Sequence, residues 1–163
     1  MEGGEVVRIE AAFIQYLLTC QGVTTLVGTR IRPLRTRQAP IKGKTAAMAP
    51  DGDTLPRITI DKISNPREAC LTGATTLSSP RLQVDVIAAS FASANAVAEA
   101  LRNCLHGFKG WMSEVFVDSC ILEDERDFED ASDGLDSAAT VGVSMDFILQ
   151  HQEARPNAVP VLE

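Results

Sequence analysis

The sequence predicts a mixed α/β (α+β) fold, with a four-stranded, mostly antiparallel sheet and two helices on one face. Apolar residues recur at three- and four-residue steps over residues 5–19, which is typical of an amphipathic helix. Apolar and polar residues alternate over residues 81–86, which is typical of a strand with one buried face. The whole pattern runs helix, strand, strand, helix, strand, strand, and this order favours helices packed on an antiparallel sheet.

The other predicted elements rest on the same periodicities and on the residues that interrupt them. Gly22 ends the first helix, and Ser90 or Ser93 caps a second helix that stops before Gly107. The remaining strands are expected to begin at Arg57, to span Val115–Leu122 and to span Ala139–Leu149.

Two long loops are predicted at residues 35–56 and 64–80, because proline, glycine and small polar residues interrupt any regular pattern there. An acidic turn is expected over Asp127–Gly134, and residues 153–163 are expected to form a flexible C-terminal tail. With 163 residues, of which 45% are apolar, the chain is long enough for one ordinary core. Residues 1–152 are therefore expected to form a single domain.

The cysteines and the first residues give no indication of an extracellular or membrane protein. The four cysteines are far apart and form no C-x-x-C motif, so reduced, buried thiols are expected. The first residues lack the basic and apolar regions of a secretory signal, and no run approaches the roughly 18 apolar residues of a membrane span. We expect a soluble, cytoplasmic chain with no membrane partner.

No motif predicts an enzyme. Gly43-Lys44-Thr45 matches the end of a phosphate-binding loop, but Gln38 stands where the motif needs a glycine and Pro50 interrupts the helix that should follow. The acidic stretch at residues 123–136 fails the calcium-loop pattern at two ligand positions, and neither histidine is spaced against other ligands for zinc. We therefore expect no catalytic residue, no cofactor and no metal.

The charge distribution is strongly asymmetric. A net charge of −7 argues against free binding to nucleic acid or to anionic lipid. Residues 30–44 contain six basic residues and no acid, whereas residues 114–136 contain ten acids and one arginine. Segments of opposite charge favour an association in which the basic patch of one copy meets the acidic patch of the next.

Four stretches of the chain resemble one known family. They are TLVGTRIRPLRTRQAP, LPRITIDKIS, SPRLQVDVIAASFASANAVAEALRNCLHGFKG and VFVDSCILEDERDFEDASDGLDSAATVGVSMDFILQHQ. The most specific pieces are the Arg-x-Gln-Val-Asp strand at Arg81–Asp85 and the Leu-Glu-Asp-Glu-Arg-Asp segment at Leu122–Asp127. In these stretches the chain is similar to the tail-completion proteins of long-tailed bacteriophages and prophages. It departs from the family in a longer loop at residues 41–54 and in an extension beyond Gln152.

The resemblance implies a tail terminator, a small α/β subunit that forms a homohexameric ring. Such a ring caps the tail tube and joins it to the head connector or stopper protein. The resemblance also implies a place at the head-proximal end of the virion tail, with assembly in the host cytoplasm. DNA is expected to pass through the lumen without tight binding.

A closed ring needs two different, complementary surfaces on each subunit. We expect two charged sets to face each other between neighbours, namely Arg30, Arg32, Arg35 and Arg37 on one subunit and Glu123, Asp124, Glu125 and Asp127 on the next. Two other function classes remain open from the sequence. One is a monomeric soluble adaptor or regulatory domain, and the other is a small hydrolase with an unrecognised site.

Overall fold

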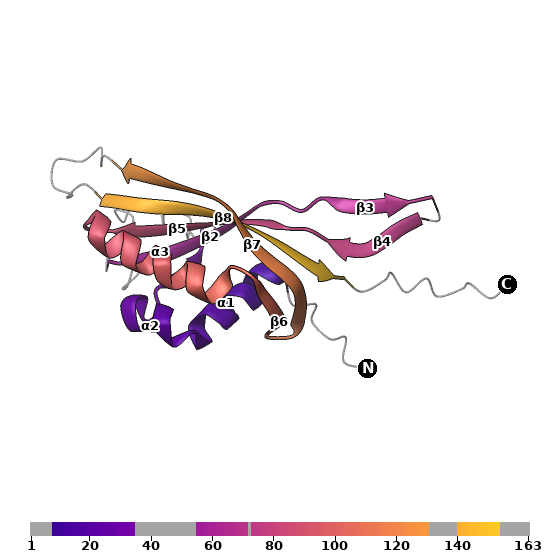
Figure 1. Cartoon of the computed structure of the whole chain (residues 1–163), viewed down its shortest axis with the longest axis horizontal. Coiled ribbons are helices and arrows are strands. Elements are labelled where there is room, and N and C mark those ends of the chain that lie inside the picture. Colours follow the sequence, from indigo (N-terminus) through magenta and orange to yellow (C-terminus); the bar gives the residue numbers. More distant parts are fainter. Residues whose placement is uncertain (1–7, 35–54, 72, 131–139, 154–163) are drawn as a thin grey trace, which may run out of the picture.

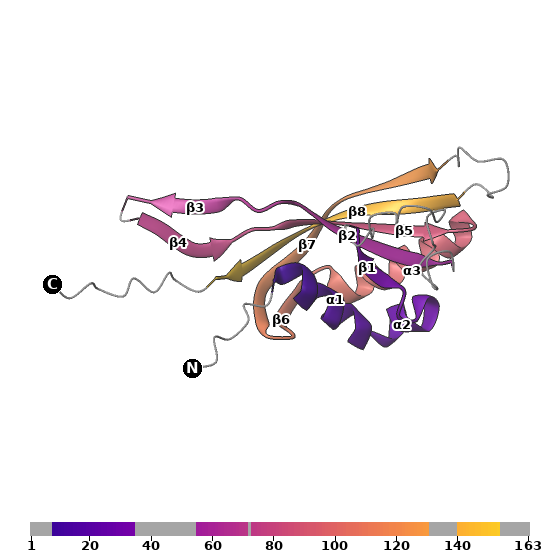
Figure 2. The ribbon, with the colours of Figure 1, turned by 180° about the vertical axis from the view of Figure 1, so that it is seen from behind.

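The helices of the described chain lie against one face of a single curled sheet (Figures 1 and 2). The computed structural model describes residues 8–34, 55–71, 73–130 and 140–153. Within these residues the helices are α1 (Ile9–Thr19), α2 (Gln21–Val27) and α3 (Phe91–Leu105). The eight strands of the described chain are β1 (Ile31–Pro33), β2 (Arg57–Ser64), β3 (Arg67–Cys70), β4 (Gly73–Ser78), β5 (Arg81–Ala88), β6 (Phe108–Met112), β7 (Val115–Asp130) and β8 (Thr140–Gln152).

The long strand β8 lies at the centre of the sheet. It pairs in antiparallel fashion with β5 on one side and with β7 on the other. From β5 the sheet continues to β2 and then to β1, which is parallel to β2. β4 pairs with the end of β8 and β3 with β4, while β6 pairs with the first part of β7. Among the described strands, β1 and β3 therefore form one edge of the sheet, and β6 and β7 form the opposite edge.

The strands β2 to β5 form one long hairpin, whose outer half extends away from the helices (Figures 1 and 2). The outer half consists of β3 and β4 and is called the arm below. The arm joins the rest of the sheet where Leu77 and Ser78 pair with the end of β8. All four residues of β3 are exposed.

The core lies between the helices and the apolar faces of the central strands. Leu82, Val84 and Val86 of β5 are fully buried, as the alternation in the sequence predicts. The fully buried Phe147 of β8 packs toward α1, where its ring centroid lies 6.3 Å from that of Phe13. Burying a side chain of this kind contributes about 1.5–3 kcal/mol, so such contacts hold the helices on the sheet.

Helix α3 begins and ends as the sequence predicts. The backbone N–H of Ser93 donates to Ser90 Oγ at 3.3 Å, which confirms a serine cap at the start of the helix. After the helix, Gly107 has a φ of +80°, a conformation that glycine adopts without strain. His106 Nδ1 accepts a hydrogen bond from the backbone N–H of Leu122 at 3.0 Å, which ties the helix end to β7.

The mixed α+β class is confirmed, but the predicted four strands and two helices are wrong. A separate second helix, α2, follows α1, and residues 31–33 form a parallel edge strand. The predicted loop at residues 64–80 is also wrong, because β3 and β4 lie within it. The arm exposes both of its faces along β3, so its sequence lacks the apolar alternation that reveals a half-buried strand. The predicted loop at residues 35–56 lies almost wholly outside the described residues.

The predicted acidic turn is wrong at its start, because residues 127–130 continue β7. Opposite this stretch, Phe128 pairs with Gly142 of β8. A Cβ atom added at Gly142 would lie 2.3 Å from the Val86 carbonyl oxygen and from Phe128 Cζ, so no larger residue fits there. Glycine at this position therefore lets Phe128 pack directly on the sheet backbone.

The cysteines differ from the expectation of reduced, buried thiols. Cys20 and Cys104 form a disulfide that links the junction of α1 and α2 to α3, with Cα atoms 6.8 Å apart. Cys70 is an exposed thiol at the end of β3. Cys120 is a buried thiol, and its burial raises its pKa to about 12. Only Cys120 matches the sequence-based expectation.

Candidate subunit interface

The predicted basic surface begins along the edge strand β1. Ile31 is buried against the helices, whereas Arg32, the next residue, is exposed. Arg30 Nε donates to the Pro56 carbonyl oxygen at 2.8 Å, so this guanidinium also holds the start of β1 against the chain that leads into β2. Arg35 and Arg37 of the predicted set lie outside the described residues. Two of the four predicted arginines are therefore placed on one edge of the sheet.

The four predicted acids all lie on β7, at the opposite edge, and all are exposed. A β-bulge lies between Leu122 and Asp124. Because of this extra residue, the side chains after the bulge alternate between the two faces of the sheet in the opposite order to those before it. Glu125 lies opposite the buried Met145 and therefore on the helix side of the sheet, where it accepts from Arg102 Nη2 of α3 at 2.8 and 2.9 Å. Asp127 is on the same side.

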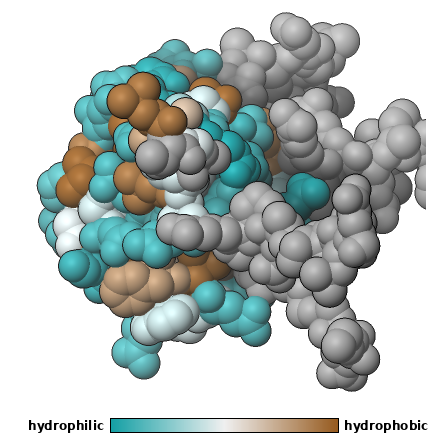
Figure 3. Space-filling view, turned by 90° about the vertical axis from the view of Figure 1, so that its right-hand side faces the viewer, coloured by the Kyte–Doolittle hydropathy of each residue, from teal (hydrophilic) through white to brown (hydrophobic). Residues whose placement is uncertain are grey.

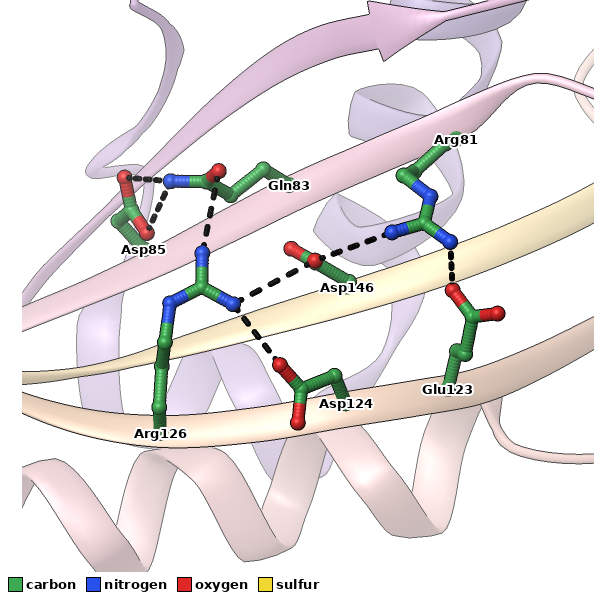
Figure 4. Close-up of polar contacts among 7 residues, drawn as sticks. All are labelled: Arg81, Gln83, Asp85, Glu123, Asp124, Arg126 and Asp146. Atoms are coloured by element: carbon green, nitrogen blue, oxygen red, sulfur yellow. Dashed lines mark hydrogen bonds and ion pairs between the residues drawn. The ribbon is translucent and has the colours of Figure 1, made fainter.

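Arginines and carboxylates form a network on the face of the sheet that carries no helix, where β5, β8 and β7 run side by side (Figure 4). Asp146 of β8 lies at its centre and is only 7% exposed. Its carboxylate is 3.6 Å from Arg81 Nη1 and 3.4 Å from Arg126 Nη1. Arg81 also pairs with Glu123, and Arg126 pairs with Asp124 at 3.1 Å. Three strands are thereby linked through one buried acid.

The network continues along β5 and remains acidic. Gln83 Nε2 donates to both carboxylate oxygens of Asp85, at 3.0 and 3.1 Å, and Gln83 Oε1 accepts from Arg126 at 3.4 Å (Figure 4). The network thus contains four carboxylates, those of Asp85, Glu123, Asp124 and Asp146, and two arginines. The negative charge of Asp146, together with the hydrogen bonds that Arg126 donates to Asp146 and Asp124, raises the pKa of Arg126 above its ordinary value.

The structure places Arg30 and Arg32 on the edge of the sheet opposite to the four predicted acids, an arrangement that a head-to-tail contact requires. It also shows what the sequence could not, namely that Glu123, Asp124 and Glu125 already have arginine partners in their own chain. Two of these partners, Arg81 and Arg102, are distant in sequence, so local charge counting misses them. Asp127 makes no ion pair with any residue that the structure describes.

Exposed apolar side chains gather along the same two edges, and the sequence analysis missed them. Leu34, Ile63 and Leu71 follow the edge of β1, β2 and β3, and Trp111, Phe116 and Ile121 lie on β6 and β7. Trp111 is 65% exposed, and its ring centroid lies 5.3 Å from that of Phe116 in an edge-to-face pair. Apolar surface at both edges is the kind of contact that gives an interface its strength, while the charges set its specificity.

A hollow of about 940 Å³ lies beside the base of the arm. Its walls come from the start of α1, the start of the arm, the β6–β7 turn and the end of β8, and they include Trp111 and Phe116. His151 also lines the hollow, is only 5% exposed and has an Nε2 atom with no hydrogen-bond partner among the described residues. Figure 3 looks at this end of the molecule and shows hydrophobic patches set among hydrophilic surface.

Two glutamates with lowered pKa values border the hollow. Partial burial alone would raise the pKa of Glu153, but hydrogen bonds from Arg67, Ser78 and Asn65 outweigh it. Partial burial of Glu10 is likewise outweighed by its 2.9 Å pair with Lys62. Both carboxylates are therefore more acidic than an ordinary glutamate. They tie the end of β8 to the arm, and α1 to β2.

This arrangement predicts that acid loosens the base of the arm. A glutamate whose pKa is lowered on folding stabilises the fold above its ordinary pKa of 4.5, and this stability is lost as the pH falls through the lowered pKa. Glu153→Gln should lower the free energy of unfolding at pH 7 by no more than about 1 kcal/mol, because Arg67 is largely exposed. It should also reduce the further loss on acidification below pH 4.5. Urea unfolding followed across pH measures both effects, with the exposed Glu68→Gln as a control. Equal pH profiles for Glu153→Gln and the unchanged chain would contradict this account.

Among the residues that the structure describes, no group of three or more histidine, cysteine, aspartate or glutamate side chains is placed to hold a metal ion. No described helix is both long and apolar enough to cross a membrane.

The chain has a two-layer α+β fold, with helices on one sheet face and charged, partly apolar sheet edges on both sides. The structure is similar to a chain in the virion of a native gene transfer agent (GTA) particle, with a TM-score of 0.64. The two chains are 19% identical, and the match covers 89% of this chain and 95% of the other. This likeness establishes a shared fold. No family model matches the sequence, and a search of curated proteins finds no similar sequence.

Proposed function

We propose that the chain is a non-enzymatic structural subunit of a phage-like virion and, more specifically, a tail terminator. The observation that carries the proposal is the match of nearly the whole fold to a chain of a GTA virion. The resemblance of the sequence to tail-completion proteins supplies the place in the particle, at the head-proximal end of the tail.

The proposed mechanism is geometric. Six subunits close into a ring by joining the β1 edge of one copy to the β7 edge of the next. One face of the ring resembles the tail tube and ends its polymerisation, and the other face binds the head connector or stopper protein. The separation of basic and acidic edges supports this scheme, because a heterologous contact that closes on itself needs two unlike surfaces.

Removal of the protein tests this function. Deleting its gene should leave filled heads together with unjoined or overlong tails, because nothing then ends the tube or presents a surface to the head. Electron micrographs of lysates, with a plasmid-borne copy as the control, measure the fraction of joined particles. Normal tailed particles in the deletion strain would overturn the proposal.

The ring must let DNA pass without holding it. Duplex DNA carries one charge per about 1.7 Å, so a lumen rich in lysine and arginine would retain it through counterion release. We expect the purified protein, with its net charge of −7, to show no tight duplex binding near physiological salt in a gel-shift assay. A sub-micromolar, strongly salt-dependent affinity that disappears when Arg35 and Arg37 are neutralised would instead assign residues 35–44 to the lumen.

A further inference from the structure

The arm is poorly supported within its own subunit. An isolated two-stranded hairpin is at best marginally stable in water, and β3 has an unpaired outer edge in the described structure. Leu71, at the end of the arm, has an exposed fraction of 109%, so its side chain contacts almost nothing in its own chain. This side chain is therefore available for contact with an apolar surface elsewhere.

A matching surface lies on the opposite edge of the sheet. On this edge, the wall of the hollow carries the largely exposed Trp111 of β6 and Phe116 of β7, which flank the turn between the two strands. In Figures 1 and 2 the end of the arm lies far from β6 of its own chain, so Leu71 does not reach this turn within one subunit.

We propose that the arm of each subunit docks into the hollow of the next, with Leu71 against the exposed Trp111 and Phe116. The inference rests on the proposed ring and names the contact that holds it together. Its occupant is a second copy, because β3 lies on the same edge as β1, and the aromatic turn lies on the same edge as the acidic part of β7. The edge-to-edge joining that pairs the charges therefore also brings each arm to a neighbour's hollow.

The hollow has a charged rim around an apolar centre. It includes the acids Glu114 and Asp118 beside the aromatic pair and the basic Arg8 at the start of α1. Such a surface is typical of a subunit contact with an apolar core and a polar rim. On the arm, Glu68 is the charged residue of β3 nearer to Leu71, because Arg67 lies at the base of the arm and pairs with Glu153.

Cross-linking within assembled particles tests the contact directly. Cys70 places an exposed thiol next to Leu71, and Glu114→Cys places a second thiol at the β6–β7 turn. Treatment of Glu114→Cys particles with a short bismaleimide should give a ladder of linked chains on a denaturing gel. The ladder should vanish in Cys70→Ser/Glu114→Cys particles and be absent when the new cysteine replaces Glu99, an exposed residue of α3.

A second measurement uses the single tryptophan. Because Trp111 is largely exposed in the subunit, its emission should shift to shorter wavelength on assembly. Leu71→Asp should abolish the shift and weaken assembly at least about tenfold, whereas Leu71→Ile should change little. Both variants should keep the melting temperature of the free subunit, since Leu71 is fully exposed there.

The outcomes separate this inference from the proposed function. Rings or particles that form normally with Leu71→Asp, or that give no ladder, would overturn the docking of the arm and leave the ring in place. Particles that never contain the chain would overturn both. A ladder together with loss of assembly in Leu71→Asp supports both.

Discussion

Reversing two charges on the basic edge, by Arg32→Glu with Arg35→Glu, should weaken association between subunits by about tenfold at low salt. Exposed ion pairs contribute only about 0 to 1 kcal/mol each, but reversal replaces attraction by repulsion, and a tenfold change corresponds to about 1.4 kcal/mol. In a closed ring, every interface loses this amount of association free energy. Sedimentation or mass photometry across a range of protein concentrations measures the effect.

Reversing charges on the acidic edge as well should restore the association between subunits. Asp127→Arg with Glu129→Arg reverses two exposed residues of β7 whose side chains make no ion pair within the described structure. Combined with the reversed arginines, these changes should restore at least part of the association, and added salt should diminish both the loss and the rescue. Arg32→Lys with Arg35→Lys keeps the charge and should assemble normally. Loss of assembly without any rescue would contradict this pairing of edges but not the ring itself.

Phe147→Ala should lower the free energy of unfolding by about 3–5 kcal/mol, the usual cost of removing a buried aromatic ring. Phe147 is fully buried on the central strand and packs toward Phe13 of α1, so its loss opens a cavity between sheet and helix. Phe147→Leu keeps much of the volume and should cost far less. Urea unfolding measures both variants. A loss below about 1 kcal/mol for Phe147→Ala would contradict the core described above.

The parts of the fold that the sequence predicts are those with one buried face. Leu82, Val84 and Val86 alternate because helices cover one side of β5, and the Ser90 cap is visible because serine accepts the backbone bond that starts a helix. The arm shows no such pattern, since both faces of β3 are exposed. The second half of β7 is rich in acids and therefore has the composition of a turn. Two of these acids, Glu123 and Glu125, are held by arginines of β5 and α3 that are distant in sequence.

The sequence predicts the charged residues of the candidate interface but not its exposed apolar residues. Counting charges along the chain finds the basic and acidic segments, because each carries charges of almost one sign only. Leu71 and Trp111 stand in segments without periodicity, so only the fold shows that both are exposed and that they lie on opposite edges. The disulfide between Cys20 and Cys104 likewise depends on packing that brings α1 and α3 together.

The proposed function requires a closed ring of this chain between tail tube and head. Electron cryomicroscopy of isolated particles, with this fold fitted into the map at the junction, shows whether the ring exists. We expect one ring of six copies at the head-proximal end of the tube, with the β1 edge of each copy against the β7 edge of the next. A junction built from other proteins, or this fold elsewhere in the particle, would contradict it.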